Sequence, residues 1–130
     1  MLKSGPSSGS VQTRLPTQSA AKDATTDAWR MRVTSIALVP LAIAFVFVIL
    51  NLIGKDYAAA HAQLGHTGPA ILILLFLLAG IIHMKIGMQS IIDDYVHVAR
   101  WKEAALMGNL FFSVVIGIAC VYAVLKISFT

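Results

Sequence analysis

Three apolar runs dominate this sequence, and each is long enough to cross a membrane. About 20 apolar residues are needed to span a bilayer core of about 30 Å. The runs cover approximately residues 33–53, 68–92 and 104–127. Only short polar segments separate them, which leaves no room for a second folded domain. The sequence therefore predicts an all-α integral membrane domain of three transmembrane helices over residues 29–130.

The composition agrees with this class. Of the 130 residues, 58% are hydrophobic and only 12% are charged, with a mean hydropathy of +0.80. A chain of this size with so few charges cannot present the polar surface of a soluble protein. The net charge of +4 comes largely from basic residues at the ends of the apolar runs. We therefore expect contact with membrane lipid and no binding of nucleic acid.

The first 28 residues have a different character. They are rich in Ser, Gly, Thr and Gln, with scattered Lys and Arg. Such a segment buries too little apolar surface to offset the entropy of ordering, so we predict a disordered or extended polar tail over residues 1–28. A mitochondrial transit peptide is also Ser-rich and basic, but Asp23 and Asp27 are not typical of one. A bacterial inner membrane is the expected location, with the mitochondrial inner membrane as the alternative.

Basic residues near the membrane boundaries set the orientation of such proteins. Four of them precede the first apolar run, one lies in the first loop and two lie in the second: Arg14, Lys22, Arg30 and Arg32, then Lys55, then Arg100 and Lys102. The amino terminus and the second loop are therefore predicted to face inward.

The second apolar run carries ionisable residues at depths from which hydrocarbon should exclude them. Such residues are costly unless they are paired, hydrated or bound, so they mark a functional site. At 100° per residue, His83, Gly87, Ser90 and Asp94 fall within about 40° of one line along the helix. Lys85 projects about 200° from His83, so it must extend toward the inner boundary or pair with a partner.

An imidazole in the middle of a membrane can be a metal ligand, a proton relay or a hydrogen-bonded packing residue. Gly87, one turn after His83, favours the ligand because it leaves room for a flat macrocycle, and haem iron accepts an axial imidazole. His97 is about 21 Å further along the helix axis, too far to bind the same iron. His61 and His66 belong to the outer loop. A second axial ligand would have to come from another polypeptide.

The inner end of the same run reads Asp93-Asp94-Tyr95. Acidic residues there are commonly solvated by the headgroup region, and a tyrosine commonly belongs to the aromatic belt. The alternative is a quinone pocket. In such a pocket the phenol hydrogen-bonds a quinone carbonyl and a carboxylate helps to supply protons. Both interpretations stay open on these residues alone.

The pattern His83-x-x-x-Gly87, followed by Asp94-Tyr95, resembles the small cytochrome b membrane anchor subunits of succinate dehydrogenase. The segment from Arg32 to Leu38 adds to the likeness, which covers roughly residues 29–127 and is closest to the alphaproteobacterial and mitochondrial type. The resemblance implies an anchor subunit of succinate:ubiquinone oxidoreductase (respiratory complex II), which is not catalytic alone. The whole complex would pass electrons from succinate, in the tricarboxylic acid cycle, to ubiquinone.

The resemblance also implies roles for single residues. His83 matches an axial ligand of haem b, with Gly87 packing beside the macrocycle. Tyr95 matches a tyrosine that hydrogen-bonds ubiquinone, with Asp94 next to it. Arg32 matches a basic residue near the haem propionates, a role that Arg30 could also fill. The implied partners are a second membrane anchor subunit that shares the haem, an iron–sulfur subunit and a flavoprotein subunit.

Two other functions fit part of the pattern. A small proton-coupled transporter component could use His83, Lys85 and Asp94 as a proton path. The first and third apolar runs are nearly devoid of ionisable groups, which disfavours it. A haem-free structural anchor is the second alternative, and it depends on a partner chain that lacks the other ligand.

Overall fold

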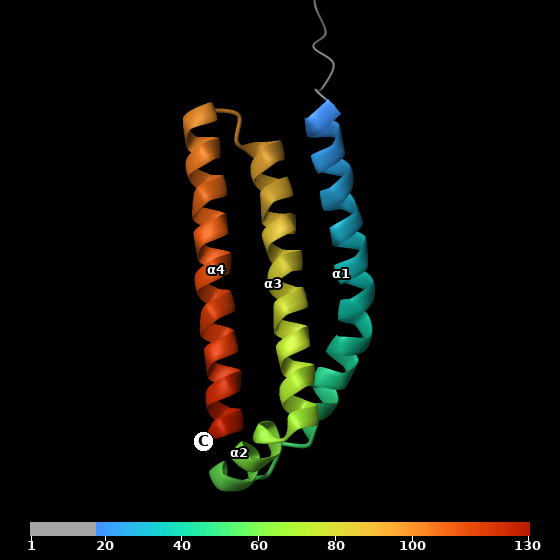
Figure 1. Cartoon of the computed structure of the whole chain (residues 1–130), viewed down its shortest axis with the longest axis vertical. Coiled ribbons are helices and arrows are strands. Elements are labelled where there is room, and N and C mark those ends of the chain that lie inside the picture. The colour runs from blue at the N-terminus through green and yellow to red at the C-terminus, as the bar shows by residue number, and fades with distance from the viewer. Residues whose placement is uncertain (1–17) are drawn as a thin grey trace, which may run out of the picture.

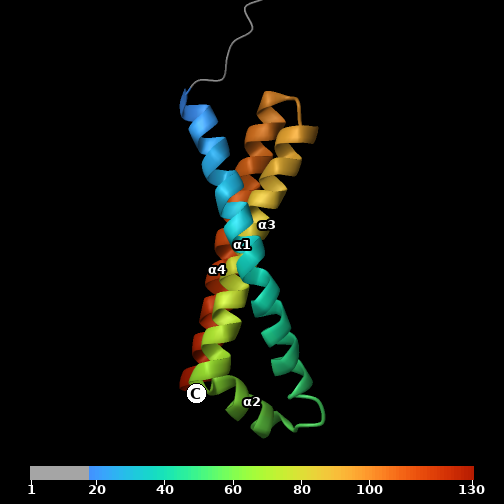
Figure 2. The same cartoon turned by 90° about the vertical axis from the view of Figure 1, so that its right-hand side faces the viewer.

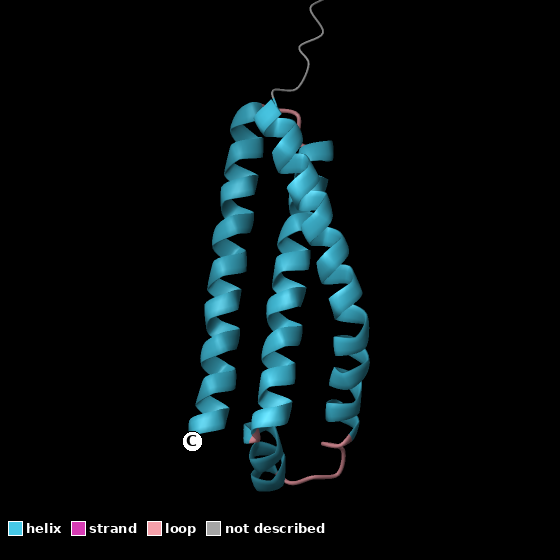
Figure 3. Cartoon of the chain, turned by 45° about the vertical axis from the view of Figure 1, so that its right-hand side comes forward, coloured by secondary structure: helices cyan, strands magenta, loops and turns pink. Residues whose placement is uncertain are grey.

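The computed structural model describes residues 18–130. In this range the regular secondary structure consists of helices joined by turns and loops. The helices are α1 (Gln18–Leu50), α2 (Tyr57–Gly65), α3 (Thr67–Tyr95) and α4 (Ala99–Phe129), as Figure 1 shows. The three long helices are each long and apolar enough to cross a membrane. The predicted all-α class and its three membrane spans are therefore confirmed (Figure 3).

Helix α3 is the centre of the bundle. It packs against α1 on one side and α4 on another, whereas α1 and α4 do not contact each other within the described residues. Figure 2 shows α1 crossing the α3–α4 pair and diverging from it toward both ends. We call the two ends of the bundle the loop end, where α1 begins and residues 96–98 join α3 to α4, and the α2 end, where the chain also terminates (Figure 1).

Helix α1 begins within the segment for which a polar tail was predicted. Residues 18–28 are helical, so the prediction of an extended segment is wrong for this part, and residues 1–17 lie outside the described range. Alanine is the best helix former, and four alanines lie in this segment. The hydroxyls of Thr25 and Thr26 donate to carbonyls one turn back, and Asp27 pairs with Arg30 at 3.8 Å. At 1.5 Å per residue α1 is about 50 Å long, so its first turns extend beyond a bilayer core.

The short helix α2 was not predicted. Its first turn is capped by the Asp56 side chain, which accepts a hydrogen bond from the Ala59 N–H at 3.2 Å. The preceding turn contains Gly54 at a φ of +79°, a conformation that favours glycine. At its other end, a Cβ on Gly65 would lie 3.0 Å from the carbonyl oxygen of Ile127, so α2 approaches the last turn of α4 closely.

Little of the chain is buried within the bundle. The buried residues of the described range are Ala70, Ile86, Ile92 and Ser113. In the most apolar stretch of the three spans, only 6%, 6% and 11% of the residues are buried. The phenyl rings of Phe45 on α1 and Phe76 on α3 stack with their centroids 4.6 Å apart. Most of the large apolar side chains are exposed, as expected for a protein surrounded by lipid and by other transmembrane helices.

Candidate functional site

His83 lies where the central helix α3 meets α1. Its side chain is half-buried, and its Nδ1 is 3.1 Å from the Thr34 hydroxyl oxygen on α1. The same oxygen is 2.9 Å from the Arg30 carbonyl and 3.1 Å from the Met31 carbonyl, one turn back in α1. Because the two ring nitrogens lie on different sides of an imidazole, Nε2 points away from this hydroxyl. Nδ1 of His83 is thus hydrogen-bonded to Thr34, and Nε2 is directed away from that contact.

Gly87 lies one turn further along α3. A Cβ placed on it would come within 3.7 Å of the Met31 Cε on α1, which is ordinary van der Waals contact. The room expected over Gly87 is thus bordered by a methionine, whose unbranched side chain has three rotatable bonds and repacks readily.

Within residues 18–130, His83 is not part of a cluster of metal-binding side chains. The described residues contain no cluster of three or more His, Cys, Asp or Glu side chains that could hold a metal ion. His61 in α2 and His66 at its end lie at the α2 end, and His97 follows α3. A lone imidazole is compatible with the axial position of a haem, because the porphyrin supplies the other four nitrogens around the iron.

Tyr95 and Asp94 lie at the end of α3. Tyr95 is 78% exposed, and Asp94 is exposed as well. Tyr95 comes 12 positions after His83, which is about 18 Å along a helix. Both side chains are therefore open to a ligand or partner outside the bundle.

The neighbouring Asp93 has a different environment. Its carboxylate pairs with the Lys102 ammonium of α4 at 2.9 Å, with both side chains partly exposed. Asp94 makes no ion pair with any described residue. The two adjacent carboxylates thus differ: Asp93 is paired with a lysine of α4, and Asp94 is not.

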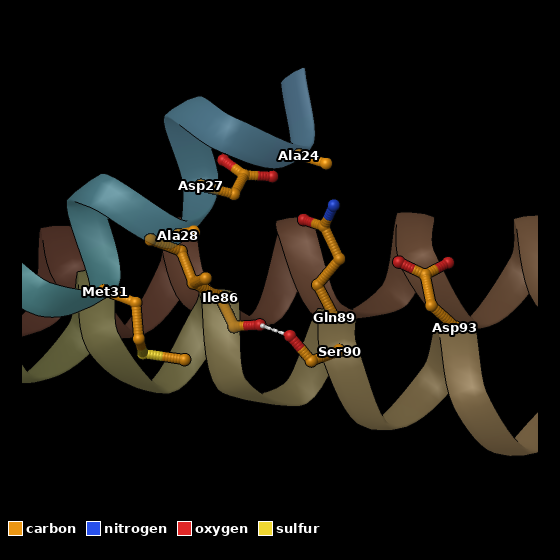
Figure 4. A pocket seen from close by; sticks show the side chains of 8 residues that line it. All are labelled: Ala24, Asp27, Ala28, Met31, Ile86, Gln89, Ser90 and Asp93. Atoms are coloured by element: carbon orange, nitrogen blue, oxygen red, sulfur yellow. Dashed lines mark hydrogen bonds between the residues drawn. The ribbon is translucent and has the colours of Figure 1, made fainter. Parts of the chain in front are cut away.

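Two grooves separate α1 from α3 toward the loop end. One has a volume of about 280 Å³, and Figure 4 shows its lining of four α1 and four α3 residues: Ala24, Asp27, Ala28, Met31, Ile86, Gln89, Ser90 and Asp93. Ser90 in this groove donates to the Ile86 carbonyl at 3.1 Å. The other, of about 410 Å³, is lined by Arg30 and Thr34 of α1 and by Lys85 of α3, among others. Lys85 therefore borders a groove that it shares with polar residues of α1.

The two candidate arginines differ in position. Both are exposed, but Arg30 lines the larger groove with Thr34, whereas Arg32 lines a separate hollow with Trp29 and Ala28. Arg30 is therefore the closer of the two to the surroundings of His83.

Sequence reasoning missed two polar contacts between helices. Thr34 touches His83, and the Asn109 amide of α4 donates to the Lys85 carbonyl of α3 at 2.9 Å. The only signal in the sequence was a hydroxyl or amide within an apolar run, which commonly serves helix packing. To predict which residues pair, one must know how the helices are aligned against each other, and the sequence alone does not show this.

Comparison with known proteins places the chain in a family. The sequence model of a family described as "Succinate dehydrogenase/Fumarate reductase transmembrane subunit" matches residues 13–124, which include most of all three long helices. The chain belongs to this family. A curated relative, the succinate dehydrogenase hydrophobic membrane anchor subunit of Paracoccus denitrificans, is 30% identical over 107 residues, covering 82% of each chain. No solved structure matches significantly.

This chain is thus a membrane anchor subunit of the succinate dehydrogenase and fumarate reductase family. Its three apolar helices and its bacterial relative make it a multi-pass protein of a bacterial inner membrane, as predicted. As an anchor subunit it belongs to a complex with other subunits of the enzyme, which agrees with its outward-facing apolar surface.

Proposed function

We propose that this anchor subunit provides one axial ligand of a haem b and part of the site at which ubiquinone is reduced. The observation that carries the proposal is the arrangement of α3. This central helix holds His83 half-buried at a helix contact and Tyr95 exposed at its end. A single straight element thus carries both a candidate iron ligand and a candidate quinone ligand.

In the haem site, His83 would bind iron through Nε2, the nitrogen directed away from Thr34. When bound, the haem would supply a one-electron redox centre. The second ligand would come from a second membrane anchor subunit, because no other described histidine lies near His83. Met31 would move aside so that the macrocycle can pack against Gly87.

A guanidinium of α1 would hold the haem propionates, because arginine forms bidentate hydrogen bonds with carboxylates. The family resemblance favours Arg32. Arg30 is better placed in this chain, since it shares a groove with Thr34.

In the quinone site, the Tyr95 hydroxyl would donate a hydrogen bond to a quinone carbonyl. Reduction of ubiquinone to ubiquinol consumes two electrons and two protons. Asp94, exposed beside Tyr95, would help to pass those protons from the aqueous phase. The basic residues at the loop end indicate that this end faces the cytoplasm. An iron–sulfur subunit and a flavoprotein subunit that oxidises succinate would dock there.

The quinone part is tested by replacing Tyr95 with phenylalanine in the complete complex. We expect Tyr95→Phe to slow succinate-dependent ubiquinone reduction by about fivefold, because one hydrogen bond contributes about 1 kcal/mol. Reduction of a soluble dye by succinate, which bypasses the quinone, should be unchanged. Tyr122→Phe makes the same change on an exposed face of α4 and serves as the matched control. Equal loss of both activities in Tyr95→Phe would contradict the proposal and indicate faulty assembly.

A further inference from the structure

We infer that Thr34 is a positioning residue for His83. Its hydroxyl oxygen accepts a hydrogen bond from the Nδ1–H of His83 and thereby leaves Nε2 as the unprotonated nitrogen. The inference rests on the proposed haem ligation and identifies the residue that keeps Nε2 of the imidazole unprotonated and available to iron.

The direction of this hydrogen bond follows from the other contacts of Thr34. A threonine hydroxyl has one proton to donate and two lone pairs that accept. The oxygen lies 2.9 Å from the Arg30 carbonyl and 3.1 Å from the Met31 carbonyl, and carbonyl oxygens can only accept. The single proton is therefore directed to the backbone of α1. Toward His83, at 3.1 Å, the hydroxyl offers a lone pair, so Nδ1 must be the donor.

This direction fixes the tautomer of the ring. A neutral imidazole carries one N–H, and a proton on Nδ1 leaves the lone pair of Nε2 available. Metal-binding histidines generally donate their other ring N–H to an oxygen atom, which sets the ring orientation and makes the ligand more basic. Thr34 supplies that oxygen from a neighbouring helix.

The hydrogen bond between Thr34 and His83 lies in surroundings that strengthen it. Both side chains are half-buried at the meeting of α1 and α3, within the apolar spans, where little water competes for the hydrogen bond. Ser35, the next residue of α1, provides a close comparison. Its hydroxyl donates to the Met31 carbonyl at 2.8 Å and makes no hydrogen bond to His83. Thr34 and Ser35 thus make similar bonds to the helix backbone, but only Thr34 also contacts the imidazole.

The experiment compares the haem midpoint potential of purified complete complexes carrying Thr34→Val, Thr34→Ser or Ser35→Ala. Thr34→Val keeps the shape of the side chain and removes the acceptor. We expect its haem potential to rise, because a less basic imidazole stabilises ferric iron less. Losing such a partner costs about tenfold or more in metal affinity. A tenfold loss confined to ferric haem corresponds to a rise of about 59 mV. Thr34→Ser and Ser35→Ala should keep the wild-type potential.

The outcomes separate this inference from the proposed function. A wild-type complex without haem would overturn both. Haem present in the wild type with an unchanged potential in Thr34→Val would overturn the role of Thr34 alone. An equal shift in Thr34→Ser or in Ser35→Ala would assign the effect to packing and would also overturn it. If Thr34→Val reduces assembly, Thr34→Ala removes the same acceptor without adding a methyl group and carries the same comparison.

Discussion

The two carboxylates at the end of α3 look equivalent in the sequence but not in the structure. Asp93 is held by Lys102 at 2.9 Å across the turn into α4, whereas Asp94 is exposed next to Tyr95. An exposed ion pair of this kind contributes only about 0–1 kcal/mol to stability. The pair therefore matters mainly for position: it holds the Asp93 carboxylate against α4, whereas the Asp94 carboxylate makes no ion pair with a described residue.

This difference leads to a prediction within one dipeptide. We expect Asp94→Asn to lower ubiquinone reduction by the complex, because it removes the carboxylate beside Tyr95 that can pass protons. Asp93→Asn, the matched control, should change it less. The measurement is the ratio of quinone reduction to dye reduction with succinate as donor. A larger effect from Asp93→Asn would assign the proton path to the other carboxylate.

A site residue can be predicted from the sequence when its immediate neighbours in the chain already make it unusual. His83 stands out in the sequence because an imidazole in an apolar run needs a reason, and Tyr95 because it ends that run beside two carboxylates. Thr34 does not stand out, since threonines are common in membrane helices. Its meaning comes from contact with His83, which is 49 positions away in the chain. Such a pairing depends on how α1 packs on α3, and one sequence does not show it.

Among the elements, the three spans were predictable because about 20 apolar residues in a row permit few other structures. The start of α1 and the helix α2 were not. Outside the membrane, helix formation depends on propensity, capping and packing, each of which is weak. Helix α2 has only 9 residues, so it is held by its cap at Asp56 and by its packing against α3 and α4.

The packing of α2 against α4 can be tested with one methyl group. A Cβ on Gly65 would meet the Ile127 carbonyl oxygen at 3.0 Å, and this backbone atom cannot easily move aside. We expect Gly65→Ala to destabilise the complex by about 1 kcal/mol, as overpacking does. Thermal unfolding of the detergent-purified complex would measure the loss.

The matched control is Gly68→Ala in the first turn of α3. A Cβ at that glycine meets nothing within 4 Å, and alanine favours the helix. Gly68→Ala should therefore not lower the unfolding temperature. If both variants unfold alike, the close approach of α2 to α4 is not a significant contact.

At the scale of the whole molecule, the bundle exposes surfaces that agree with packing against other subunits. Within residues 18–130 its central helix is flanked by only two other long helices, and most of the large apolar side chains are exposed, among them Met84, Met88 and Ile91 near the candidate sites. The His83 imidazole can fill only one axial position of a haem. Both features agree with an anchor that completes its sites together with other subunits.

The central claim is that His83 binds haem iron. The most direct test is the reduced-minus-oxidised absorbance spectrum of the purified complex carrying His83→Ala, with His97→Ala, at the exposed position just after α3, as the matched control. Succinate-dependent dye reduction in both complexes verifies that they have assembled. We expect the haem bands to be lost or shifted in His83→Ala and retained in His97→Ala. A wild-type haem spectrum in an assembled His83→Ala complex would contradict the account.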